Sequence, residues 1–148
     1  MIVQELLDAK NPHVVTVRPS TTLVEEAHAL TTHRIGALVI TDDAGRLLGI
    51  ISERDLTKAI VQFMAGLFDR QVADVMTRKV VTCSPDDSVA EVLYLMNSNH
   101  IRHIPILDRE GMVGIISIRD VTKNWLELLE RENQQLRGAV GADVHRSA

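Results

Sequence analysis

Apolar and polar residues follow the same pattern twice along the chain. Each pattern contains a ten-residue stretch, which reads GIISERDLTK at residues 49–58 and GIISIRDVTK at residues 114–123. The stretch opens on an apolar, β-branched run that is typical of a buried strand, and after Ser and Asp the apolar spacing becomes helical. The pattern therefore predicts a Ser and an Asp at a strand-to-helix junction, and it predicts this junction twice.

The similarity between the two halves extends beyond these stretches. Residues 14–27 match residues 80–93, and residues 35–42 match residues 101–108. Each half predicts the order strand, helix, strand, strand, helix. A unit of about 60 residues is only marginally stable by surface-to-volume scaling, so the two units are expected to pack together with pseudo-two-fold symmetry. The predicted fold class is α+β (α/β), with two β-α-β-β-α repeats and a C-terminal helix.

Capping and turn residues indicate where the helices and strands begin and end. The expected elements are a short helix at residues 3–9, a break at residues 11–13, strands at residues 14–17, 37–41 and 104–107, and a helix from Thr22 to about His33. The expected domains are a first repeat with the N-terminal helix at residues 1–70, a second repeat at residues 71–130, and a helix end with a flexible tail at residues 131–148.

The last helix is expected to reach about Arg137 and to end at Gly138, with a frayed tail after it. Its apolar stripe is narrow and includes Trp125, Leu129 and Leu136, while its other faces are charged. Such a helix suits either a lid over the core or a two-helix dimer contact.

The composition excludes several classes of protein. Of the 148 residues, 45% are hydrophobic, which is enough for a packed core. The net charge of -4 and the lack of a basic stripe argue against a nucleic-acid partner. Cys83 is the single cysteine, so no disulfide framework or thiolate metal site is expected. No signal segment and no apolar run of about 20 residues is present, so we expect a cytoplasmic protein without a membrane partner.

The repeated body and its motifs resemble the CBS domain, which is named after cystathionine β-synthase. The resemblance rests on a V-x-T segment before a Pro turn, an h-P-I-h-D strand and the G-I-I-S-x-x-D junction, and it covers about residues 3–129. Two such domains in tandem resemble a Bateman module. The resemblance implies a regulatory module, usually a homodimer, whose cleft between the repeats binds an adenosine-containing ligand. Such ligands are AMP, ADP, ATP, NAD and S-adenosylmethionine, and no further cofactor is implied.

The chemistry of an adenosine nucleotide indicates which residues would bind it. An ionised carboxylate accepts hydrogen bonds from both vicinal ribose hydroxyls, and a helix N-terminus attracts phosphate. Asp55 and Asp120 are therefore the ribose candidates. The candidate hydroxyl donors are Ser52 and Ser117, the candidates beside the base are Thr16, Ile35, Ala37, Val81, Thr82 and Ile101, and the phosphate candidates are Arg54, Arg102, His103 and Arg119. The sites are expected to differ, because Arg102 and His103 replace Gly36 and Ala37 of the first copy.

Each of these residues also has a structural interpretation. Ser-x-x-Asp is the sequence of a helix capping box, so Ser52 and Asp55 suit a cap as well as a ligand site. Arg54 and Arg119 suit a solvated surface. His100 and His103 lack the further ligands that zinc needs, and no nucleophile with a matching base is present, which argues against an enzyme.

The leading hypothesis from the sequence is a stand-alone sensor of an adenine nucleotide that acts on an unknown target protein in trans. The alternative is a constitutive dimeric scaffold with degenerate ligand sites. A homodimer is expected in both cases, because the helices of the repeats have more apolar positions than one chain can cover. These positions are Leu56, Ile60, Phe63, Leu93 and Leu95.

Overall fold

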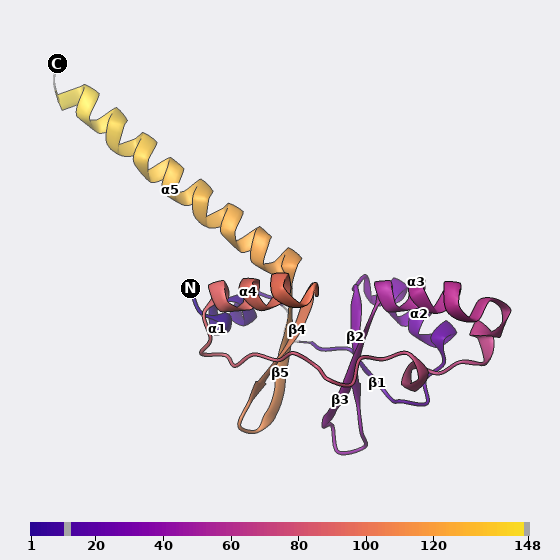
Figure 1. Cartoon of the computed structure of the whole chain (residues 1–148). Helices are drawn as coiled ribbons and strands as arrows, with labels where there is room; N and C mark the ends of the chain where they lie inside the picture. Colours follow the sequence, from indigo (N-terminus) through magenta and orange to yellow (C-terminus); the bar gives the residue numbers. More distant parts are fainter. Residues whose placement is uncertain (11–12, 147–148) are drawn as a thin grey trace.

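The computed structural model describes residues 1–10 and 13–146, with the side chains described up to residue 141. The predicted break falls partly on residues 11 and 12, and the predicted tail ends at residues 147 and 148; these four residues lie outside the described part. The described residues form two lobes side by side, and one long helix leaves the second lobe (Figure 1).

The two lobes correspond to the two repeats. The first contains β1 (Thr16–Val17), α2 (Leu23–His33), β2 (Ala37–Thr41), β3 (Leu47–Ser52) and α3 (Glu53–Phe63). The second contains α4 (Val89–Asn99), β4 (His103–Asp108), β5 (Gly111–Ser117) and α5 (Ile118–Arg146). The preceding segments contain α1 (Val3–Asp8), η1 (Met64–Asp69) and η2 (Val72–Asp74). Strand β2 lies between parallel β1 and antiparallel β3, and β4 pairs with antiparallel β5. The predicted α+β fold of two repeats is confirmed.

The first helix of each repeat begins where the capping sequence predicts. The Thr22 hydroxyl accepts a hydrogen bond from the Glu25 amide at 3.1 Å, and the Glu25 carboxylate accepts one from the Thr22 amide at 3.0 Å. Ser88 and Glu91 form the same reciprocal pair at the start of α4, with both distances at 3.1 Å. Each box satisfies two amides that would otherwise lack partners.

The second repeat differs from the prediction at its first strand. This strand is reduced to a single parallel bridge between Cys83 and Ile106. The reason lies in the neighbouring strand. In the first repeat, the Val39 amide donates to the Val15 carbonyl at 3.5 Å. The matching residue of the second repeat is Pro105, which has no amide hydrogen to donate. The ladder therefore cannot extend toward Val81.

The segments that precede the repeats are exchanged between the lobes. Helix α1 packs on the second repeat, where the Val3 amide donates to the Asp87 carbonyl at 2.9 Å. The segment around η2 packs on the first repeat, where the Val72 amide donates to the Thr21 carbonyl at 2.8 Å. The core of each lobe therefore includes residues that precede the other lobe in the chain, and this exchange ties the two repeats together.

The glycine that opens each ten-residue stretch allows this exchange. A Cβ atom at Gly49 would lie 2.8 Å from the sulfur of Met76, and a Cβ atom at Gly114 would lie 2.5 Å from a methyl carbon of Leu7. Both distances are too short for a real side chain. The exchanged segments can therefore lie against β3 and β5 only because these positions have no side chain.

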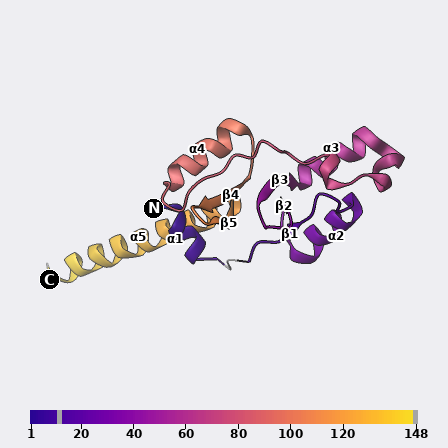
Figure 2. The same ribbon diagram turned by 90° about the horizontal axis from the view of Figure 1, so that it is seen from below.

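Helix α5 corrects the predicted end of the last helix. It continues through Gly138 to Arg146, and it extends away from both lobes in two perpendicular views (Figures 1 and 2). A glycine ends a helix when it adopts a left-handed conformation, but of the described glycines only Gly45 and Gly111 have a positive φ. Gly138 therefore only lowers the local helix propensity. No helix within the described residues is long and apolar enough to cross a membrane.

The apolar helix positions that suggested a homodimer are mostly covered within one chain. Leu56 and Phe63 pack against the core of the first repeat, and Leu93 and Leu95 pack against the core of the second. Ile60 alone of the five is exposed. The exposed large apolar side chains of α3, η1 and α4 are Ile60, Val61, Met64, Phe68 and Tyr94.

Candidate functional site

Both Ser–Asp junctions form helix capping boxes. At the start of α3, the Asp55 carboxylate accepts from the Ser52 amide at 2.8 Å and from the Ser52 hydroxyl at 3.0 Å, all through Oδ2. At the start of α5, the Asp120 Oδ2 atom accepts from the Ser117 amide at 2.8 Å. Capping therefore uses the Oδ2 atom of each carboxylate, and the described residues donate no hydrogen bond to the Oδ1 atom of Asp55 or of Asp120.

A cavity of about 900 Å³ lies between the repeats, next to the Asp55 junction. Seven of the residues predicted from the sequence line it: Ser52, Arg54, Asp55, Val81, Ile101, Arg102 and His103. It is also lined by Gly36 and His100, which the sequence analysis mentions without assigning them to the site, and by residues that the sequence did not indicate: Ile50, Glu53, Thr57, Lys58, Thr77, Lys79, Val80 and Asn99. The junction of the first repeat therefore faces the segments around β4 of the second.

Positive charge gathers around this cavity. Four cationic side chains line it, namely Arg54, Lys58, Lys79 and Arg102. Only two carboxylates, Glu53 and Asp55, line the same cavity, so the cations exceed the acids by two, although the whole chain has a net charge of -4. Such a local excess attracts anions. Lys58 and Lys79 could have been noticed in the sequence, since each lies three residues or fewer from a predicted site residue.

A buried acid lies behind Asp55. The Glu26 side chain on α2 has 0% exposure, and neither of its carboxylate oxygens has a hydrogen-bond partner among the described residues. Burial, together with the negative charge of Asp55, raises the pKa of Glu26 to about 7. The matching residue of the second repeat is Val92, which is also buried. Sequence reasoning missed Glu26, although a carboxylate at an apolar helix position was its signal.

His103 of β4 packs on the first repeat at Gly36. A Cβ atom at Gly36 would lie 3.0 Å and 3.1 Å from two atoms of the His103 ring. Burial lowers the pKa of His103, while Asp120 and Glu53 oppose this shift. The small residues of the first repeat thus accommodate the larger His103 of the second.

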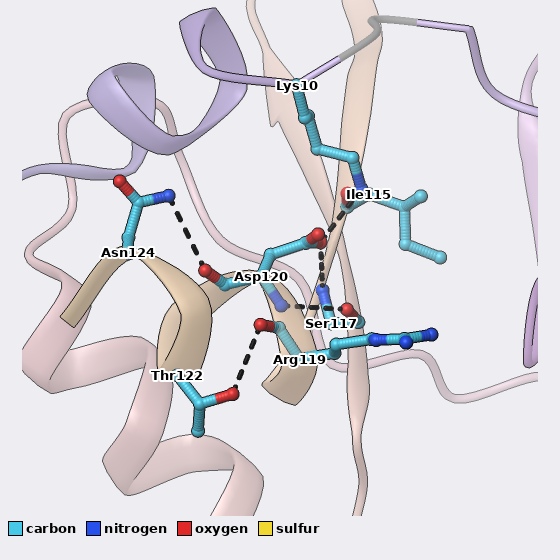
Figure 3. A network of polar contacts seen from close by, with 7 residues as sticks. All are labelled: Lys10, Ile115, Ser117, Arg119, Asp120, Thr122 and Asn124. Carbon is cyan, nitrogen blue, oxygen red and sulfur yellow. Dashed lines mark hydrogen bonds and ion pairs between the residues drawn. The ribbon is translucent and has the colours of Figure 1, made fainter. Parts of the chain in front are cut away.

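The Asp120 junction differs from the Asp55 junction because its carboxylate forms an ion pair within the chain. The Lys10 ammonium donates to Asp120 Oδ2 at 2.8 Å and to the Ile115 carbonyl at 2.9 Å, and Figure 3 shows this network. Burial acts to raise the pKa of Asp120, but the hydrogen bonds from Lys10 and Ser117 outweigh it, so the pKa is lowered. Lys79 is the counterpart of Lys10 by position, since seven positions separate Val3 from Lys10 and seven separate Val72 from Lys79. Lys79 lines the large cavity with Asp55, but the described residues show no ion pair between the two.

A smaller cavity, of about 100 Å³, adjoins Asp120 between Lys10, Lys123 and Glu127. Asp120, Ser117 and Arg119 do not line the large cavity, and neither do the predicted base contacts of the first repeat. The predicted residues outside the large cavity are Thr16, Ile35, Ala37, Thr82, Ser117, Arg119 and Asp120. The structure therefore brings together half of the predicted residues, all around Asp55.

Comparison with known proteins agrees with this architecture. The CBS domain model matches the chain twice, over residues 3–62 and 72–127, and the chain belongs to the CBS domain family. The solved CBS-domain protein ATU1752 from Agrobacterium tumefaciens is 40% identical with a TM-score of 0.81, covering 84% of this chain and 98% of that chain. The predicted identity as a tandem CBS pair is thus confirmed.

Two other solved structures contain ligands. The CBS domain pair of MJ0100, in complex with 5'-methylthioadenosine and S-adenosyl-L-methionine, is 27% identical with a TM-score of 0.74, and it covers 84% of this chain and 95% of that chain. PAE2072 from Pyrobaculum aerophilum, complexed with AMP, is 28% identical with a TM-score of 0.72, covering 81% of this chain and 89% of that chain. MJ0100 and PAE2072 are therefore two CBS pairs of this fold that bind adenosine compounds.

Curated relatives place the same pair in longer proteins. CBSX3 of Arabidopsis thaliana, described as mitochondrial, is 34% identical over 79% of this chain, which spans 61% of that relative. The inosine-5'-monophosphate dehydrogenase of Methanocaldococcus jannaschii is 38% identical over 74% of this chain, which spans 21% of the enzyme. The activities of those whole proteins therefore do not follow from the similarity.

Proposed function

We propose that this chain is a regulatory module that binds an adenosine nucleotide in the cavity between its repeats. The observation that supports this most strongly is that Asp55 and four cationic side chains line one cavity of about 900 Å³. A volume of roughly 300–1,000 Å³ is usual for small-molecule sites. The ligands of MJ0100 and PAE2072 support the choice of an adenosine compound.

In this proposal different residues of the cavity bind the ribose, the adenine and the phosphates. The Asp55 Oδ1 atom accepts hydrogen bonds from the ribose hydroxyls, while Oδ2 continues to cap α3. The apolar side chains of Ile50, Val81 and Ile101 cover the adenine ring. Arg102 and the other cationic side chains of the cavity bind the phosphates, where guanidinium groups can form paired hydrogen bonds with phosphate oxygens.

The charge of the cavity favours a ligand with several phosphates. A surplus of two positive charges stabilises an anion such as ADP or ATP and disfavours the sulfonium cation of S-adenosylmethionine. We therefore expect affinity to rise from adenosine through AMP to ADP and ATP. A rise of this kind should weaken as salt screens the surface charges.

We infer that each chain binds one nucleotide. At the second junction Lys10 already supplies the positive partner that Asp120 needs, and the adjoining cavity of about 100 Å³ is too small for an adenosine. Asp120 is in this account a structural residue that holds the segment after α1 against β5. The proposal differs here from the sequence interpretation, which gave both aspartates a ribose.

The proposed output is regulatory rather than catalytic. The nucleotide would act by binding one arrangement of the two lobes more tightly than another, and the change would be read by a target protein in trans. The module is proposed to act as a homodimer in the cytoplasm.

A thermal-shift series tests the proposal on protein that has been shown to be free of nucleotide. The series contains adenosine, AMP, ADP, ATP, NAD, S-adenosylmethionine and inorganic tripolyphosphate as the control for charge alone. A ligand at 100 times its dissociation constant stabilises the protein by about 2.7 kcal/mol. We expect the largest shifts with ADP and ATP. If no adenosine compound shifts the melting temperature, the cavity is degenerate and the chain is a scaffold.

A further inference from the structure

The outer part of α5 has no lobe to pack against. The helix has 29 residues, and at 1.5 Å per residue it is about 44 Å long. It starts at the Ser117–Asp120 junction and extends away from both lobes in both views (Figures 1 and 2). A helix without tertiary packing is only marginally stable in water. A partner on its apolar side would supply the missing stabilisation.

Four exposed apolar side chains of this outer part follow a heptad pattern. Leu126, Leu129, Leu136 and Val140 are between 57% and 67% exposed, while Leu128, at 38%, lies beside the stripe at a c position. Together with Asn133, the four residues of the stripe are separated alternately by three and four residues, which is the spacing of the a and d positions of a coiled coil. Residues 126, 133 and 140 are then a positions, and residues 129 and 136 are d positions. An apolar stripe this narrow suits packing against one other helix rather than burial in the core of a lobe.

The residue types at these positions indicate a parallel pair of identical helices. Leucine at d positions with a β-branched residue at an a position favours a coiled coil of two helices. A single Asn at an a position fixes the register of the helices and their number in the coil. In a parallel pair in register, Asn133 faces Asn133 of the second copy, and their amides can bond to each other. In an antiparallel pair the a and d layers exchange, so Asn133 would face a leucine and its amide would lack a partner.

The flanking charges agree with the same arrangement. Glu132 precedes Asn133 and occupies a g position, and Arg137 occupies the following e position. In a parallel pair each g residue faces the e residue of the next heptad on the other helix, and such pairs set orientation and partner choice. Glu132 of each copy would therefore face Arg137 of the other. An antiparallel pair would place g opposite g and lose this attraction.

We propose that residues 126–140 of α5 form a parallel two-stranded coiled coil with the same segment of a second copy of this chain. The two lobes of each copy then lie at the N-terminal end of the coiled coil. Because α5 begins at the Asp120 junction, the coil is continuous with the second repeat. The proposal concerns α5 alone and does not depend on the identity of the nucleotide.

Disulfide trapping tests the geometry directly. In a parallel pair in register, residue 136 faces its own copy, within the roughly 7 Å between Cα atoms that a disulfide allows. Leu136→Cys should therefore form a cross-linked dimer under mild oxidation, whereas Gln135→Cys, at an outward c position, should stay unlinked. The native Cys83 does not compete, because it is buried and burial raises the pKa of its thiol to about 11. Absent or equal cross-linking of the two variants would overturn the proposal.

A charge exchange tests the orientation without altering the apolar stripe. Arg137→Glu alone places two acids opposite each other, and Glu132→Arg alone places two cations opposite each other, so each homodimer should weaken. When the two variants are mixed, every g–e contact joins opposite charges again. Native mass spectrometry should then show the mixed dimer in more than the statistical half of the dimers. A mixed dimer that makes up half of the dimers or less would contradict the parallel pairing.

Discussion

The two repeats share almost the same ten-residue stretch, yet their aspartates have opposite neighbours. Asp55 lies near the buried acid Glu26 and faces a wide cavity, whereas Asp120 is bonded to the ammonium of Lys10. Among the described residues Asp55 forms no ion pair, although cations line its cavity, whereas Asp120 already has an ion pair within the chain. Since both motifs cap a helix in the same way, the motif alone does not make a ligand site. The residues around it decide whether the aspartate is available.

The largest expected effect concerns Glu26 and its counterpart Val92. The pKa of Glu26 is raised from 4.5 to about 7 by burial and by Asp55, so the folded state binds more protons than the unfolded state between these values. The free energy of unfolding should therefore fall as the pH rises from 4.5 to 7, by roughly 3 kcal/mol at about 1.4 kcal/mol per pKa unit. Urea unfolding across this range measures the fall.

Two variants of Glu26 separate its charge from its polarity. Glu26→Val, which copies the second repeat, should remove this fall and stabilise the protein at pH 8 by about 1–3 kcal/mol. Glu26→Gln should also remove the fall but should stabilise less, because its amide stays buried. An unchanged pH dependence in both variants would show that another group causes it.

The next effect concerns the contact between Gly36 and His103, where a small residue of one repeat meets a large one of the other. Gly36→Ala places a methyl group about 3.0 Å from the half-buried His103 ring, and overpacking of this kind costs about 1–3 kcal/mol. The same substitution in a His103→Ala background should cost much less, because the space is then open. Thermal melts of the four proteins give the coupling, and equal costs in both backgrounds would rule out the contact.

The smallest effect concerns Lys10. Lys10→Met keeps the length of the side chain and removes its charge, and loss of this partly exposed ion pair should cost at most about 1 kcal/mol at pH 7. The pKa of Asp120 is lowered in the folded protein, so the contribution of the pair is present at neutral pH and disappears as the pH falls through that pKa. Carboxyl NMR should show the pKa of Asp120 rising in the variant, and an unmoved pKa would contradict the ion pair.

Much of the fold could be predicted because it depends on local sequence. The capping boxes of α2 and α4 and the duplicated strand-to-helix junction depend on residues within three or four positions of each other. The exchange of α1 and the η2 segment between the lobes could not be predicted in this way, since it depends on packing between distant parts of the chain. The missing strand before Pro105 was visible in principle, because proline cannot donate to a ladder.

The candidate site was predicted only in part for a similar reason. A repeat leads to the expectation of two equal sites, so Asp55 and Asp120 received the same role. What separates them lies outside the ten-residue stretch, in the ion pair of Lys10, in Glu26, and in Lys79 and Arg102 at the large cavity. Lys10 lies more than a hundred residues from Asp120, and no local pattern links them. Differences between aligned copies, such as Glu26 against Val92, are the signals that sequence reasoning can use.

A calorimetric titration of ATP into the wild type, Asp55→Ala and Asp120→Ala distinguishes one nucleotide site from two. We expect one nucleotide per wild-type chain. Loss of hydrogen bonds to a charged group, at about 1.5–3 kcal/mol each, should weaken binding tenfold to a hundredfold or more in Asp55→Ala. Asp120→Ala should bind within about twofold of the wild type, although it loses a helix cap worth about 1 kcal/mol of stability. Two nucleotides per chain, or equal losses of affinity in both variants, would show that Asp120 also binds nucleotide.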